Sequence, residues 1–157
     1  MNVRSWRQDQ EYADAIIAVD KDDEPLILVE TKPMKDASRL GVLQLLKHLQ
    51  QTDIPFGIFA DLEAIRIFSR DVIDPFLPLC VFKTADVLSR YEPKFGEKRI
   101  FSSYLDALIG AWLDDFAFHW KSEHPPGSDE MKALGLSERL SGGMTGNWRV
   151  LSDPRLY

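Results

Sequence analysis

Runs of apolar residues predict two paired strands near the start of the chain. Residues 13–20 and 25–29 are short apolar segments, rich in β-branched side chains, which is typical of buried strands. The charged residues 21–24 between them have the composition of a turn, which would fold the second strand antiparallel onto the first. The second strand closes on the Glu-Thr-Lys of residues 30–32, so a carboxylate and an ammonium stand at the end of an apolar run.

A helix is expected next, at residues 36–51, with Asp36 or Ser38 as its N-cap. Its apolar positions keep helical spacing, and a polar stripe with the same period lies on the other face (Gln44, Lys47, His48 and Gln51). Such a stripe faces solvent by default.

Strands follow at residues 56–60 and 64–68, and residues 3–7 are a further candidate strand. The order strand, strand, helix, strand, strand predicts a mixed α/β fold around a central sheet.

The second half is predicted to be mainly helical, at residues 84–91, 100–121 and 128–140. Asp114 and Asp115 are expected to face solvent on the longest of these helices.

These patterns divide the chain into a domain at residues 1–124 and a C-terminal extension at 125–157. Within the domain, residues 1–70 form a motif-bearing sheet core and 71–124 a helical part. The extension ends in residues too apolar for a free tail, so it is expected to pack on the body or on a partner subunit.

Composition narrows the class of protein. An apolar fraction of 45% indicates a globular core, while a net charge of −6 argues against a non-specific nucleic-acid coat protein. The single Cys80 allows no internal disulfide, which fits a reducing compartment. The sequence shows neither a leader nor an apolar run of about 18 residues, so we expect a cytoplasmic protein that has no membrane partner.

The end of the second strand carries the candidate chemistry. Because strand side chains alternate, Glu30 and Lys32 point the same way, about 6–7 Å apart, and Asp14 on the preceding strand could join them. Such charges are costly to desolvate without a partner. Two interpretations stay open: a divalent-metal phosphodiesterase site, or a structural Glu30–Lys32 ion pair with Asp14 as a turn or cap residue.

Asp14, then Glu30-x-Lys32, then Gln44 on the following helix resemble the motifs of the PD-(D/E)xK nuclease superfamily. The nearest likeness is to the N-terminal nuclease domain of type I restriction enzyme R subunits and their small stand-alone relatives. The similar stretches read Ala13–Ile17, Leu28–Pro33, Gln44-x-x-x-His48, Pro55–Phe59 and Ile65–Phe68. Together they span about residues 11–70, and His48 stands where the family more often has tyrosine.

The resemblance implies a restriction-endonuclease-like mixed central sheet flanked by helices, here with a helical C-terminal extension. It implies that Asp14, Glu30 and the backbone carbonyl of Thr31 bind Mg²⁺, with Mn²⁺ as the alternative ion. Lys32 would orient the attacking water and offset charge in the transition state. Gln44 would support that water or contact the substrate backbone, and His48 is a less favoured participant.

Two function classes remain. The first is a Mg²⁺-dependent DNA endonuclease of the restriction or repair type. The second is a catalytically inactive nuclease-fold module that binds DNA or a protein partner. The aromatic-rich helix at 100–121 and the tail at 148–157 further predict a homodimer, and the family likeness suggests restriction-system subunits as other partners.

Overall fold

The computed structural model describes residues 15–72 and 74–147, which form a mixed α/β unit, as the sequence predicts. Its strands are β1 (Ile16–Val19), β2 (Pro25–Thr31), β3 (Phe56–Ala60), β4 (Ala64–Ser69), β5 (Cys80–Lys83) and β6 (Met144–Asn147). The helices of this part are α2 (Ser38–Gln50), α3 (Thr84–Leu88), α4 (Ser102–Phe118), α5 (Ser128–Ala133) and α6 (Leu136–Leu140). The expected strand at 3–7 lies outside the described residues.

All six strands belong to one open sheet in the order β5-β4-β3-β2-β1-β6. Neighbouring strands are antiparallel except β2 and β3, which are parallel. The exception follows from connectivity, because a parallel neighbour needs a crossover and α2 supplies it.

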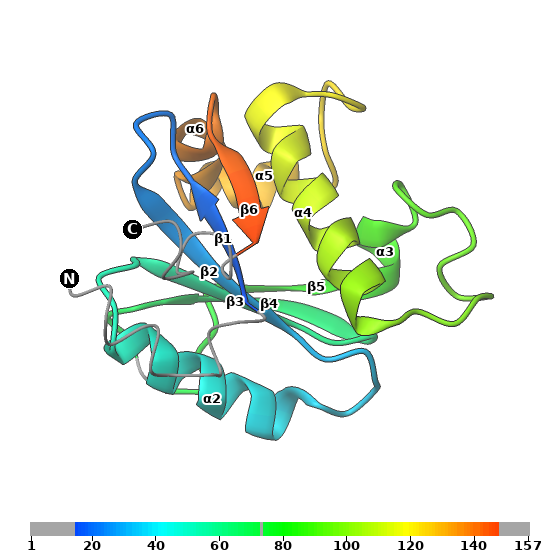
Figure 1. Cartoon of the computed structure of the whole chain (residues 1–157), viewed down its shortest axis with the longest axis horizontal. Helices are drawn as coiled ribbons and strands as arrows, with labels where there is room; N and C mark the ends of the chain where they lie inside the picture. The colour runs from blue at the N-terminus through cyan, green and yellow to red at the C-terminus, as the bar shows by residue number, and fades with distance from the viewer. Residues whose placement is uncertain (1–14, 73, 148–157) are drawn as a thin grey trace, which may run out of the picture.

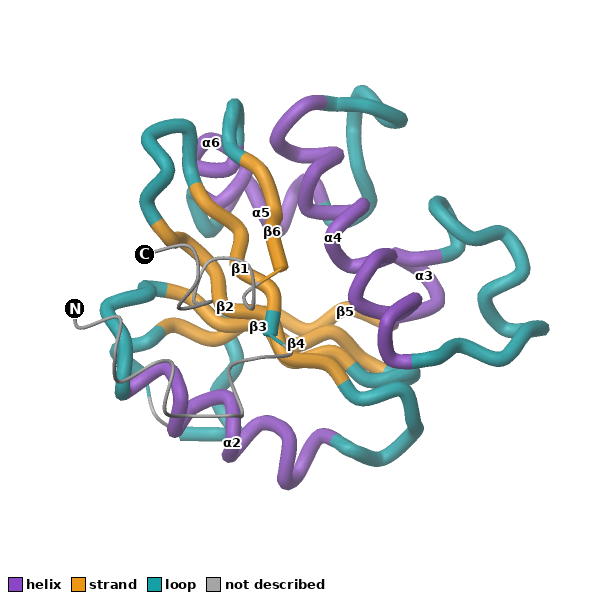
Figure 2. The backbone as a smooth tube through the Cα atoms, in the orientation of Figure 1, coloured by secondary structure: helices purple, strands orange, loops and turns teal. Residues whose placement is uncertain are grey.

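Helices cover the two faces of the sheet unequally. Of the described helices, Figure 1 shows α2 on one face and α3 to α6 gathered on the other, and the tube of Figure 2 shows the same two layers. Each face has its own core. Ile17, Leu28, Phe59 and Phe68 pack with α2 in one cluster, whereas the larger cluster under α4 includes Ile27, Val29, Ile65, Ile67 and Trp112.

The apolar run of β2 is explained by its central place. Leu26, Ile27, Leu28 and Val29 are each at most 1% exposed, and their side chains enter both clusters. A strand that is buried on both faces needs a near-continuous apolar sequence.

Long-range pairing adds two strands that local pattern did not predict. β5 and β6 are four-residue strands at the two edges of the sheet. β6 pairs antiparallel with β1, and on its other side the Thr145 N–H donates to Asp114 Oδ1 at 2.9 Å. A carboxylate that occupies an edge N–H disfavours pairing with another chain.

Helix boundaries also differ from expectation. The single helix expected at 128–140 is two short helices, because Gly135 adopts a left-handed φ of 76° between them.

Neither Asp36 nor Ser38 caps α2 with its side chain. Instead, the buried Asp61 accepts the Ala37 N–H at 3.3 Å, from 24 residues along the chain.

The expectation that Asp114 and Asp115 face solvent is wrong for Asp115, while Asp114 is half-buried. Asp115 is 0% exposed and accepts hydrogen bonds from the Tyr91 hydroxyl and from the backbone N–H groups of Lys121 and Ser122. Burial works to raise the pKa of Asp115, but these hydrogen bonds outweigh it and hold that pKa below the usual value. Asp115 thereby fixes the turn that follows α4.

The aromatic residues of α4 divide between core and surface. Trp112 is 0% exposed, meets Phe82 and Phe116 edge-on, and donates from Nε1 to the Pro126 carbonyl at 2.8 Å. Phe118 remains about half-exposed. None of the described helices is long and apolar enough to cross a membrane.

A glycine sets how closely α2 approaches the sheet. A Cβ on Gly41 would lie 2.1 Å from the ring of Phe59 on β3, whereas a Cβ on Gly96 would meet nothing within 4 Å. We expect Gly41→Ala to lower the free energy of unfolding by about 1–3 kcal/mol, since the clash must be relieved by shifting a packed helix. Gly96→Ala is the matched control and should stay within about 0.5 kcal/mol of wild type. Urea unfolding measures both, and equal effects would contradict this account of the packing.

Candidate functional site

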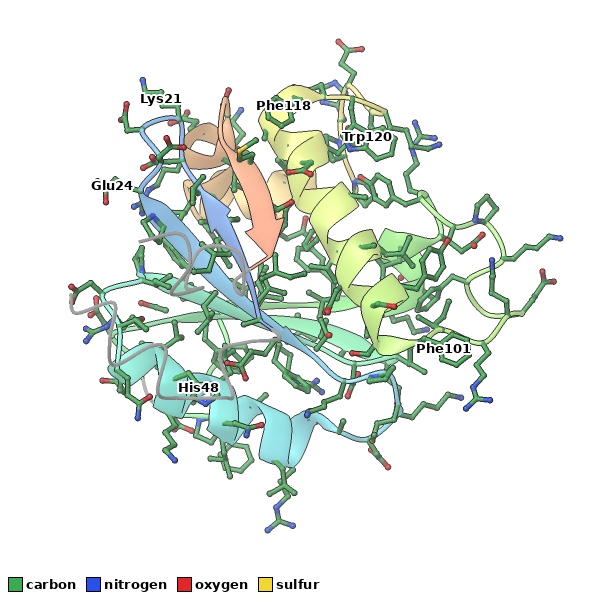
Figure 3. All side chains as sticks on the ribbon, viewed as in Figure 1. Lys21, Glu24, His48, Phe101, Phe118 and Trp120 are labelled. Carbon is green, nitrogen blue, oxygen red and sulfur yellow. The ribbon has the colours of Figure 1, made fainter. Side chains whose placement is uncertain are left out.

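The end of β2 is held by a side chain from α2. The Glu30 carboxylate lies 2.5 Å from Nδ1 of His48, and the two side chains are 13% and 1% exposed. A carboxylate accepts, so Nδ1 carries the proton and donates it to Oε2. Figure 3 labels His48 on α2, beneath the sheet. The polar stripe of α2 therefore does not face solvent throughout, because its His48 points inward at a candidate site residue.

The next residue is held from the opposite face of the sheet. Thr31 donates its hydroxyl to Asp106 on α4, with Oγ1 and Oδ1 2.5 Å apart. Successive strand side chains point to opposite faces, so Glu30 and Thr31 are directed toward α2 and α4, respectively. The last two residues of β2 are thus anchored to both helical layers, and the backbone carbonyl of Thr31, a predicted metal ligand, belongs to a restrained segment.

Lys32 is exposed and directly follows β2. Its N–H donates to the Ala60 carbonyl at 3.0 Å, which continues the ladder between β2 and β3. Strand alternation then places Lys32 on the Glu30 side of the sheet. In the described part of the chain Glu30 pairs with His48 rather than with Lys32, so the structure does not show the structural ion pair of the second interpretation.

The other predicted site residues are Gln44 and Asp14. Gln44 is half-buried on α2, four residues before His48 and therefore on the same flank of the helix. Asp14 lies outside the described residues, so its convergence with Glu30 stays a prediction. Among the described residues, no three His, Cys, Asp or Glu side chains are grouped as metal ligands.

The donors at the end of β2 match the chemistry of a hard cation. Mg²⁺ prefers carboxylate and carbonyl oxygens and usually takes only one or two carboxylates together with waters. His48 holds one oxygen of Glu30, which leaves the second oxygen to a ligand. The chemistry of the described donors is therefore compatible with Mg²⁺, and Asp14 as a further ligand stays a prediction.

A second concave feature runs along α4. A groove of about 650 Å³ lies between α4 and the strands β1 and β6, and Asp106 and Asp114 both line it. Burial raises the pKa of Asp114 above its usual value, although hydrogen bonds from Thr145 oppose that shift. Figure 3 shows Phe118 and Trp120 near one end of α4 and Phe101 at the other.

No protein-family model, curated protein or solved structure matches the chain. The family likeness therefore stays a prediction from its motifs.

The sequence analysis gave His48 only a minor role and missed Asp106. His48 gave a weak signal, since it lies one turn after Gln44 in the same polar stripe. Asp106 gave none, because it lies 75 residues from Thr31 in the sequence and the packing of α4 brings them together.

The Glu30–His48 contact is expected to be energetically coupled. We expect His48→Leu to lower the free energy of unfolding by about 1–3 kcal/mol, because it leaves a poorly solvated carboxylate without its donor. A double-mutant cycle with Glu30→Met should give a coupling energy of at least about 0.5 kcal/mol. Lys47→Ala, at the exposed neighbouring position, is the control and should change stability by less than about 0.5 kcal/mol. Additive single effects would show that the contact is not formed in solution.

Proposed function

We propose that this chain is a Mg²⁺-dependent DNA endonuclease of the restriction or repair type, with a restriction-endonuclease-like sheet. The observation that carries the proposal is the restrained end of β2, where a carboxylate held by a buried histidine stands two residues before an exposed lysine. A pre-positioned carboxylate at a rigid strand end, with a lysine two residues further on, suits metal-assisted hydrolysis of a phosphodiester.

Each residue at this end has a role in that reaction. Glu30, the Thr31 carbonyl and Asp14 would hold the cation, which supplies a Lewis acid and an acidified water. Lys32 would orient the attacking water and offset negative charge as the phosphorus is attacked. Gln44 would support the water or the substrate backbone. His48 would keep Glu30 in one orientation, as outer partners of metal-binding carboxylates do.

The groove along α4 favours a second candidate, a nuclease-fold module that binds a partner without cutting. Phe118 and Trp120 are 53% and 52% exposed beside the acidic groove wall, and exposed aromatic residues are enriched in protein interfaces. The homodimer and the restriction-system subunits expected from the sequence are possible occupants. This non-cutting binding module becomes the preferred function if the wild-type chain cuts no DNA.

Two substitutions separate catalysis from cation binding. With Mg²⁺ and duplex DNA, Lys32→Ala should reduce cleavage by about 10²-fold or more while the rise in melting temperature caused by Mg²⁺ persists, because lysine is not a ligand. Glu30→Gln should remove both effects, since it replaces a metal-binding carboxylate. Cleavage is followed on gels and melting by fluorescence.

Lys47→Ala is the matched control, because it removes an exposed lysine from α2 to which the proposed reaction gives no role. A wild-type protein that neither cuts DNA with Mg²⁺ or Mn²⁺ nor melts higher in their presence would overturn the proposed function.

A further inference from the structure

Arg66 on β4 is a cation for which neither the fold nor the proposed reaction accounts. Its strand neighbours Ile65 and Ile67 are 0% exposed and pack in the cluster under α4. Because strand side chains alternate, Arg66 is directed to the opposite face, the one that α2 covers in part and where Phe68 packs.

The guanidinium of Arg66 has an unsatisfied nitrogen. Nη1 is buried and has no hydrogen-bond partner within residues 15–72 and 74–147. Arg70, on the same side of the molecule, shows the usual outcome, since its Nε donates to the carbonyls of Leu49 and Thr52. Buried donors are nearly always paired, so an orphaned nitrogen on a charged group indicates a missing partner that can accept.

Arg66 lies in the same cross-strand row as Glu30. Glu30 is the partner of Phe59 in the β2–β3 register, and Phe59 is the partner of Arg66 in the β3–β4 register. Two strand spacings place the backbones of Glu30 and Arg66 about 10 Å apart. Gly41 of α2 packs on Phe59, between them. A ligand that touches both side chains would therefore pass across the N-terminal end of α2.

That end of α2 is rimmed by exposed cations. The loop before α2 is pinned to the turn before β4, because the Leu62 N–H donates to the Met34 carbonyl at 3.0 Å and the Asp36 N–H donates to Glu63 Oε1 at 2.9 Å. This contact brings the loop and the start of β4 together. The exposed charged residues of this rim are Lys32, Lys35, Arg39 and Lys83 on the basic side and Asp36 and Glu63 on the acidic side.

We propose that Arg66 binds a phosphate group of the nucleic-acid backbone. The basic residues of the rim (Lys32, Lys35, Arg39 and Lys83) would contact the same backbone, starting from the end of β2. The inference rests on the proposed nucleic-acid substrate, but not on cleavage. Arg66 as a whole is only partly buried, so phosphate oxygens would accept from its guanidinium, including the unpaired Nη1, and its planar donor geometry suits them. A separation of about 10 Å lies within the reach of neighbouring phosphates on one DNA strand, so one strand would contact both the end of β2 and Arg66.

Binding can be measured without cutting. The wild-type chain is titrated into a fluorescent DNA duplex in EDTA, and anisotropy is followed over a range of salt concentrations. We expect Arg66→Met to weaken binding about tenfold, the scale of one charge-assisted contact. The slope of log affinity against log salt should fall by about 1. Arg99→Met removes the same charge from an exposed site beside Phe101 and should change neither quantity.

Stability distinguishes a binding role from a structural one. Arg66→Met should melt at or above the wild-type temperature, because it removes a buried donor that no group in the described part of the chain satisfies. A structural arginine would instead lower the melting temperature when replaced. Should this variant fail to fold, the Lys35→Ala/Lys83→Ala double variant tests the same surface at exposed positions and should also weaken DNA binding.

The outcomes separate the alternatives. Equal losses of DNA affinity in Arg66→Met and Arg99→Met, or no loss of affinity in either, would overturn the inference. The proposed function would still be open to the separate cleavage test. Protection from melting by inorganic phosphate that depends on Arg66, without any DNA binding, would indicate a free phosphate ligand and overturn the nucleic-acid form. Wild-type self-association that Arg66→Met abolishes, again without DNA binding, would assign the surface to a protein interface instead.

Discussion

The structure depends on β2 being buried on both faces and yet ending in polar side chains. Leu26 to Val29 supply apolar surface to two separate clusters, and removal of that surface from water drives the packing of both layers. Where the strand leaves the core, its polar residues need partners. Because side chains alternate, one partner must come from each layer, and His48 and Asp106 are those partners.

This arrangement makes the geometry of the site a property of the whole packing. The orientation of Glu30 depends on the place of α2, which in turn depends on the contact between Gly41 and Phe59. Thr31 depends equally on α4. A carboxylate held in this way loses little further freedom when it binds a ligand, which is the physical advantage of a site on a rigid strand end.

Helix α4 uses its aspartates for three different contacts. Asp106 anchors β2, Asp114 occupies an edge N–H of β6, and Asp115 fixes the turn after the helix. In sequence they look like ordinary polar positions of a surface helix. Their different roles follow from what packs around α4, since each carboxylate accepts donors from a different neighbouring segment.

The sequence by itself determined β1 to β4 and α2, as well as the candidate residues at the end of β2. Those features arise from periodicity and from residue types that lie close together along the chain, which local patterns record. The same alternation implies that Arg66 and Ile65 point to opposite faces of β4, although not that Nη1 of Arg66 is buried without a partner among the described residues.

Only the tertiary structure decided which residues are hydrogen-bonded to the end of β2 and which strands pair at the edges of the sheet. His48 lies 18 residues from Glu30 and Asp106 lies 75 from Thr31, and the short edge strands β5 and β6 gain their pairing from residues distant in sequence. Such contacts leave no periodic signal, because they arise from how the layers pack rather than from the spacing of neighbours along one element.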